Sequence, residues 1–143
     1  MRFYGVKSER RTGLRSGASM DPEARTVAIV EDDDLVRSAT VSLVRSLGLQ
    51  VAPYRSALEF LDAPPESLGC ILSDFHMPGM SGLEFHETLR ARGDRIPFIL
   101  ITAYPTEQIR ERANEGGILC LLEKPGTTES LVACLSQIFG PLG

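Results

Sequence analysis

The sequence is poor in several features that mark particular classes of protein. It has no Trp, and none of its apolar runs approaches the roughly 18 residues that a membrane-spanning helix needs. The N-terminus carries basic residues but no uninterrupted apolar stretch behind them, so it does not resemble a secretory signal. We therefore expect a cytoplasmic protein without a membrane segment.

Cysteine and histidine are also scarce. Cys70, Cys120 and Cys134 form no CxxC pair and lie in apolar segments, where small buried thiols are common. The two histidines, His76 and His86, do not have the spacing of metal ligands. These patterns argue against a zinc or redox role, and we expect three reduced cysteines in the core.

Positive charge is concentrated at the start of the chain. Residues 1–25 carry a net charge of +3, whereas residues 26–143 carry −7. An acidic domain binds the phosphates of nucleic acids poorly, so we expect no direct DNA binding. Residues 1–25 are predicted to be a flexible basic tail, within which Met20 is a candidate for an alternative start, and residues 26–143 to be one domain.

From Thr26 onward, short apolar runs alternate with longer stretches of helical periodicity. The third and fourth runs are apolar almost throughout, as in strands covered by helices on both faces. The pattern predicts an α/β fold, a doubly wound parallel sheet of five strands with helices on both faces. The strands are expected at residues 26–30, 49–54, 69–73, 97–102 and 118–122, and the helices at about 34–47, 56–61, 81–92, 106–114 and 128–139.

Polar residues follow several of the predicted strands, where ligands bind in open parallel sheets. Glu31 and Asp32 follow the first strand and Asp74 follows the third, so three carboxylates would lie together. Clustered carboxylates repel one another unless a cation joins them. Oxygen ligands without a nearby His or Cys favour Mg²⁺. Asp33 and Asp34, by contrast, are sufficiently explained as caps of the first helix.

Asp74 precedes a Pro- and Gly-containing turn, and turn formation alone would be a structural explanation for it. Its position beside two other acids instead favours a nucleophile. Lys124 is the only Lys after residue 25, and it follows the fifth strand. Considered alone, Lys124 could be an ordinary surface residue and Thr102 an ordinary strand residue. Opposite the acids, both can hold phosphoryl oxygens.

Four motifs together resemble the receiver domain of bacterial two-component response regulators. They are IVEDD at residues 29–33, ILSDFHMPGMSGLEF at 71–85, LITA at 100–103 and EKP at 123–125. The resemblance runs from about Thr26 to Phe139 and implies the strand order 2-1-3-4-5. The second and third motifs are most similar to the branch of receivers that usually carries a C-terminal helix-turn-helix domain. Because the sequence ends at Gly143, we expect a single-domain regulator.

The resemblance also implies a role for each site residue. Asp74 would accept the phosphoryl group, and Thr102 and Lys124 would hold its oxygens. Mg²⁺ would be bound by Asp32, Asp74 and the backbone carbonyl of His76, and by Glu31 mainly through water. The implied phosphodonor is a histidine kinase or a histidine phosphotransfer protein. The implied output is a protein contact, with a downstream target or in a homodimer, on the face of the fourth helix, fifth strand and fifth helix. Such a domain is a signalling switch and not an enzyme.

Two positions depart from the receiver pattern. Leu121 stands where many receivers have a switching Tyr or Phe, and Gly126 stands where a Phe is common. A degenerate receiver that acts without phosphorylation is therefore one alternative. An aspartate-nucleophile phosphatase is another, but it would have a second Asp where this chain has His76. A flavodoxin-like cofactor binder would need a phosphate-binding loop after the first strand, where this chain has four acids.

Overall fold

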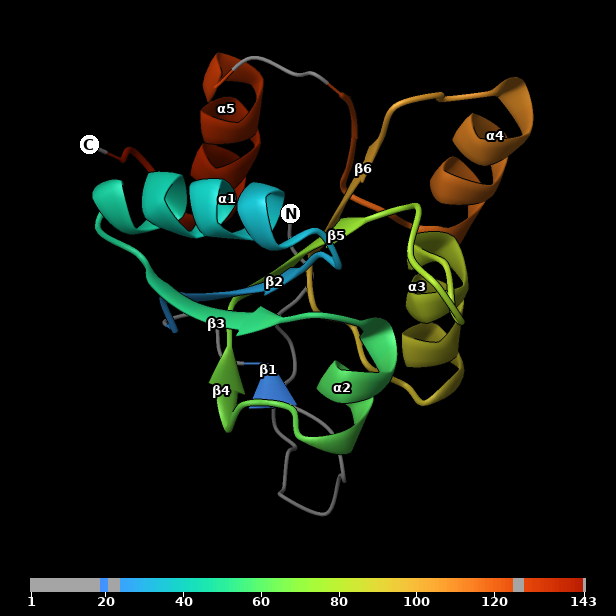
Figure 1. The fold of residues 1–143 in the computed structure, drawn as a ribbon, viewed down its shortest axis with the longest axis horizontal. Helices are drawn as coiled ribbons and strands as arrows, with labels where there is room; N and C mark the ends of the chain where they lie inside the picture. Colours follow the sequence, from blue (N-terminus) through green and yellow to red (C-terminus); the bar gives the residue numbers. More distant parts are fainter. Residues whose placement is uncertain (1–18, 21–23, 125–127, 143) are drawn as a thin grey trace.

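The computed structural model describes residues 19–20, 24–124 and 128–142. Five parallel strands form the main sheet, in the order β3-β2-β5-β6-β7 (Figure 1). These are the five predicted strands, and their order confirms the predicted doubly wound topology. The strands are β2 (Thr26–Val30), β3 (Gln50–Tyr54), β5 (Cys70–Asp74), β6 (Phe98–Thr102) and β7 (Cys120–Glu123), and the helices are α1 (Asp34–Ser46), α2 (Ala57–Asp62), α3 (Gly82–Ala91), α4 (Glu107–Gly116) and α5 (Thr128–Phe139).

A second, two-stranded pair lies below the main sheet in Figure 1. It joins β1 (Ser19–Met20) and β4 (Ser67–Leu68) in parallel. The sequence pattern predicted neither strand, since two residues carry no readable periodicity. Most of the predicted basic tail, residues 1–18, lies outside the described residues.

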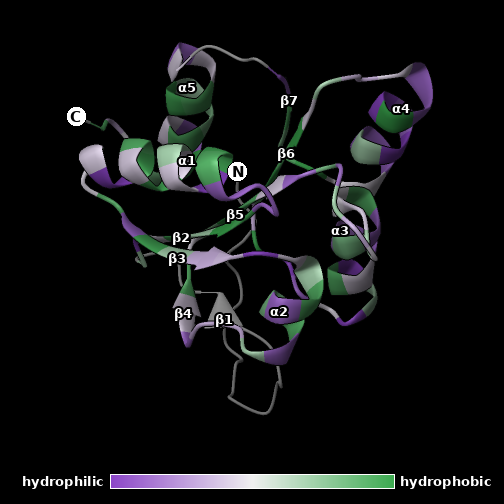
Figure 2. Cartoon of the chain, in the orientation of Figure 1, coloured by the Kyte–Doolittle hydropathy of each residue, from purple (hydrophilic) through white to green (hydrophobic). Residues whose placement is uncertain are grey.

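The helices cover the two faces of the main sheet, with α1 and α5 on one side and α2, α3 and α4 on the other (Figure 1). Two cores follow from this arrangement. Ile29 and Leu72 pack with Leu135 of α5, whereas Ile71 and Leu100 pack with α2 and α3 on the opposite face. The central strands are accordingly coloured largely as hydrophobic in Figure 2. Burial on both faces explains the continuous apolar runs.

Side-chain caps fix where four of the helices begin. Each cap side chain accepts a hydrogen bond from a backbone N–H in the first turn, which would otherwise lack a partner. In α3, Ser81 and Glu84 form a reciprocal capping box. The capping residues are Asp33 for α1, Ser56 for α2, Ser81 for α3 and Thr106 for α4.

The expectation of three reduced cysteines is wrong for two of them. Cys120 of β7 and Cys134 of α5 form a disulfide, and their Cα atoms are 6.6 Å apart. Cys70 is free and fully buried, as predicted. A separation of 14 residues has no recognisable spacing signature, because the packing of α5 on the sheet creates the pairing. None of the described helices has the length and apolar character needed to cross a membrane.

Candidate functional site

Four strand ends bring the predicted site residues to one edge of the sheet. Asp74 is the last residue of β5, and Thr102 is the last residue of β6. Glu31 directly follows β2, and Lys124 directly follows β7. The site lies where the strand order reverses, because the chain passes from β2 outward to β3 and then back to β5.

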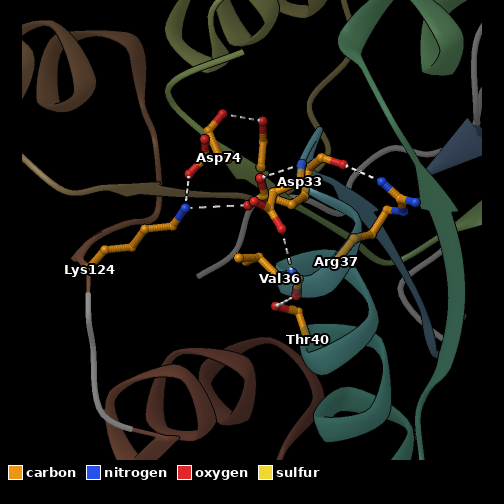
Figure 3. Close-up of polar contacts among 8 residues, drawn as sticks. Asp33, Val36, Arg37, Thr40, Asp74 and Lys124 are labelled. Carbon is orange, nitrogen blue, oxygen red and sulfur yellow. Dashed lines mark hydrogen bonds and ion pairs between the residues drawn. The ribbon is translucent and has the colours of Figure 1, made fainter.

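Lys124 joins two buried carboxylates. Its Nζ lies 2.7 Å from Asp74 Oδ1 and 3.4 Å from Glu31 Oε1 (Figure 3). Asp74 and Glu31 are each only 6% exposed. The backbone N–H of Lys124 donates to the carbonyl of Thr102 at 2.8 Å, which attaches the start of the β7–α5 connection to the end of β6. The structure thus confirms the predicted proximity of the Lys and the acids.

The pKa values of two of these groups are shifted in the direction that their surroundings dictate. Burial raises the pKa of Glu31, and the negative charge of Asp74 adds to this effect. A bond from the Asp33 N–H and the charge of Lys124 oppose it. Burial acts to lower the pKa of Lys124, but hydrogen bonds and charges from Asp74 and Glu31 outweigh it and raise the pKa. Lys124 is therefore held as the ammonium ion.

The acidic cluster suits a hard divalent cation. Glu31, Asp32 and Asp74 each offer a carboxylate oxygen, and these oxygens lie within 4.8 Å of one another. Asp32 is exposed, which leaves one side of the cluster open to water, and Mg²⁺ keeps several waters in protein sites. His76 lies on the exposed loop two residues after Asp74. Its carbonyl remains a predicted ligand.

Thr102 is fully buried at the edge of the site. Its Oγ1 accepts a hydrogen bond from the backbone N–H of Tyr104 at 3.2 Å. This bond uses a lone pair of the oxygen, and the hydroxyl hydrogen remains free to be donated to a phosphoryl oxygen. Tyr104 itself is 73% exposed. Leu121, the predicted departure from the family pattern, packs against the core on the α3 side, and Gly126 lies outside the described residues.

Sequence reasoning missed Arg37, which organises the acidic loop. Its Nη1 donates to the backbone carbonyl of Glu31 at 3.0 Å, and its Nη2 contacts Asp34 Oδ1 at 2.6 Å. Along the chain, the two contacted residues lie on either side of Asp32. The rigid fork of a guanidinium suits such a double contact. The sequence signal that could have indicated this role is an Arg about one helical turn after the four acids at residues 31–34.

Sequence reasoning also missed the close approach at Gly82. Its backbone N–H donates to the carbonyl of Phe75 at 2.9 Å, which brings the start of α3 against the end of β5. A Cβ at this position would lie 2.7 Å from Leu100 Cδ1 and closer still to the carbonyl oxygen of Asp74. The Gly therefore permits α3 to pack directly behind the proposed nucleophile.

This fold and this site define a doubly wound α/β domain with an acidic cluster at the carboxyl edge of its sheet, and comparison with known proteins identifies its family. Residues 27–136 match the response regulator receiver domain. The chain belongs to this family, whose members are signalling domains of two-component systems and not enzymes.

Individual relatives agree with this assignment. The chain is 38% identical over 120 residues to the transcriptional regulatory protein FixJ of Azorhizobium caulinodans, which covers 83% of this chain and 57% of that protein. It is 36% identical to the response regulator protein TodT of Pseudomonas putida, over 87% of this chain and 54% of that protein. This chain thus spans just over half the length of these curated relatives.

Solved structures give the same result. The crystal structure of FixJ-N superposes with a TM-score of 0.73 at 29% identity, covering 82% of this chain and 95% of that one. The low-resolution structure of the response regulator StyR gives 0.72 at 35% identity, covering 80% of this chain and 58% of that one. FixJ is a transcriptional regulatory protein, and the match covers only 57% of its length. The expectation that the protein does not bind DNA directly therefore has no support.

Proposed function

We propose that this domain is a phosphorylation-dependent switch in which Asp74 accepts a phosphoryl group. The observation that carries the proposal is the contact of Lys124 Nζ with Asp74 Oδ1 at 2.7 Å, in a cluster that also contains Glu31 and Asp32. A buried carboxylate paired with an ammonium ion at the open edge of a sheet is placed to meet a second protein. In two-component systems that protein is a histidine kinase or a histidine phosphotransfer protein.

The proposed reaction is an in-line displacement at phosphorus. A carboxylate oxygen of Asp74 forms a bond to phosphorus while the bond from phosphorus to the imidazole nitrogen of the donor breaks, and the leaving imidazole takes up a proton. Lys124 turns its ammonium toward the transferred oxygens, and Thr102 donates its hydroxyl to one of them. The product is an acyl phosphate, which water hydrolyses.

Mg²⁺ fits the donor set, since three carboxylates cluster and one of them faces solvent. Asp32 and Asp74 would bind it directly with the carbonyl of His76, and Glu31 mainly through water. When bound, Mg²⁺ offsets negative charge on the carboxylates and on the phosphoryl oxygens. Without a cation, the cluster holds three carboxylates against the single ammonium of Lys124.

The proposed output follows from the position of Thr102 and Lys124. Phosphorylation adds about −1.5 to −2 of charge and new acceptor oxygens. A shift of Thr102 toward these oxygens moves the segment with Tyr104, and a shift of Lys124 moves the end of β7. The face formed by α4, β7 and α5 is therefore the proposed contact surface for a downstream protein or a second copy of the chain.

Labelling with acetyl phosphate tests the assignment. Intact-mass spectrometry should show one phosphoryl group on the wild-type protein with Mg²⁺ and none after chelation of divalent cations. Asp74→Asn should abolish the added mass, because an amide is not a nucleophile at neutral pH. Asp62→Asn, a matched change in α2 away from the site, should label normally. Continued labelling of Asp74→Asn would show that another residue accepts the group.

A further inference from the structure

We infer that Cys120 and Cys134 form a thiol–disulfide exchange site that regulates the phosphoacceptor site. The inference rests on the proposed function for what it regulates, but its chemistry depends only on the cysteine pair. Cys120 opens β7, which lies beside β6, and Cys134 lies in α5. The disulfide is thus a covalent link between a strand and a helix of the proposed output face.

The covalent ring contains the lysine of the site. The disulfide closes a ring from residue 120 to residue 134, and Lys124 lies within it. Just before Lys124, Glu123 is paired with Thr102 in the sheet register, and Lys124 itself donates to the carbonyl of Thr102. A change in the conformational freedom of this ring therefore affects Lys124 and Thr102, the residues proposed to hold the phosphoryl oxygens.

The burial of the three cysteines makes the exchange selective. Cys120 is half-buried, whereas Cys134 is only 2% exposed, so an attacking thiolate reaches the Cys120 sulfur first. Cys70 is fully buried, and burial raises the pKa of its thiol well above the ordinary range. Because the thiolate is the reactive form, Cys70 does not compete for the exchange.

The exchange balances with a dithiol or two molecules of glutathione as reductant. The thiolate of the reductant attacks the Cys120 sulfur, the disulfide breaks, and Cys134 leaves as a thiolate that takes up a proton. A second thiolate then attacks the mixed disulfide and releases Cys120. Two electrons pass to the protein, which ends with two thiols. Glutathione disulfide drives the reverse reaction.

The two redox states differ in how α5 is held. In the oxidised state the disulfide fixes α5 to β7. In the reduced state, α5 is held against β7 by packing alone. Leu131 and Leu135 of α5 belong to the core on the face of the sheet that α1 and α5 cover. Oxidation thus restricts the segment that phosphorylation is proposed to move, and it restrains the response at Lys124 and Thr102.

Hydrogen exchange measures the restraint directly. For a ring of about 15 residues, the loop-closure entropy corresponds to on the order of a hundredfold in an opening equilibrium. Some backbone amides of β7 and α5 exchange only when these two elements separate. These amides should exchange about a hundredfold more slowly in the oxidised protein than in the reduced protein. Cys134→Ser should match the reduced protein in either buffer, whereas Cys70→Ser should keep the difference.

The experiment uses the wild-type chain equilibrated with glutathione or glutathione disulfide, so it does not depend on the folding of a variant. The initial rate of labelling by acetyl phosphate with Mg²⁺ is measured in the same two states and should be slower in the oxidised one. Absence of the disulfide by mass spectrometry in glutathione disulfide, or equal exchange in the two states, overturns the cysteine site. Equal labelling rates despite different exchange overturn its regulatory role. No labelling in either state would refute the proposed function instead, and exchange would still decide the cysteine site.

Discussion

Replacement of Gly82 by Ala should displace the backbone behind the proposed nucleophile. The added Cβ would lie 2.7 Å from Leu100 Cδ1 and closer to the carbonyl oxygen of Asp74, and real Cβ contacts are essentially never shorter than 3.0 Å. The oxygen belongs to the backbone of the central strand β5, so it cannot rotate away. Either α3 or the end of β5 must move.

The expected cost is about 2 kcal/mol. Overpacking of a filled site costs about 1–3 kcal/mol, and the gain from placing Ala rather than Gly in a helix is at most about 1 kcal/mol. The gain is smaller at Gly82, because this residue is the first of α3. Urea denaturation followed by circular dichroism should show a lower midpoint with an unchanged slope. The rate of acetyl phosphate labelling of the folded variant should also fall, since the end of β5 carries Asp74.

Gly116→Ala is the matched control, because Gly116 also lies in a helix without a positive φ. Its Cβ would approach His86 Cε1 at 3.3 Å, which requires a shift of only a few tenths of an ångström in a side chain. Gly116 is the last residue of α4, so its gain in helix propensity is also below about 1 kcal/mol, but it opposes this mild contact, and the stability should change by less than about 1 kcal/mol. Equal stabilities of the Gly82→Ala and Gly116→Ala proteins would refute the steric reasoning.

Two further predictions concern buried or organising polar groups. Burial, with a contribution from Arg90, lowers the pKa of His86 from 6.5 to about 4. The unfolded chain therefore binds more protons between these pH values, and folding stability should fall by up to about 3 kcal/mol as pH decreases through this range. Denaturation at several pH values should show this loss diminished in His86→Leu relative to the control His76→Gln; parallel curves would contradict it. Arg37→Gln should weaken Mg²⁺ binding about tenfold in calorimetry, because it removes both contacts that hold the acidic loop. Asp34→Asn, which keeps the contact with the Glu31 carbonyl, should weaken binding less, and an unchanged affinity in Arg37→Gln would exclude this role.

The three central strands of the main sheet, β2, β5 and β6, were predictable because each is buried on both faces. Their burial requires continuous apolar runs, and such runs as residues 97–102 stand out against the polar helix surfaces between them. The observed strand, Phe98–Thr102, differs by one residue. The pair β1 and β4 was not predictable, because two-residue strands are defined by what they lie beside and not by a pattern of their own.

The site was predictable as far as strand topology determines it. Parallel strands bring their carboxyl ends to one edge, so once the sheet was assigned Asp74 and Lys124 were expected at the same edge, on strands separated only by β6. Arg37, Gly82 and the disulfide depend instead on distances between packed elements. An Arg in the first turns of a helix, a Gly in a turn and two Cys in apolar segments are each ordinary in sequence, and only the tertiary contacts distinguish them.

The charge balance of the site links these findings. One ammonium ion is shared between Asp74 and Glu31, at 2.7 Å and 3.4 Å. A phosphoryl group on Asp74 would bring new oxygens that compete with both carboxylates for Lys124. On the proposed function, phosphorylation therefore acts on the residue that directly follows β7. The disulfide joins the first residue of β7 to α5. Phosphorylation and oxidation would therefore both act on how β7 is held against α5, through different chemistry.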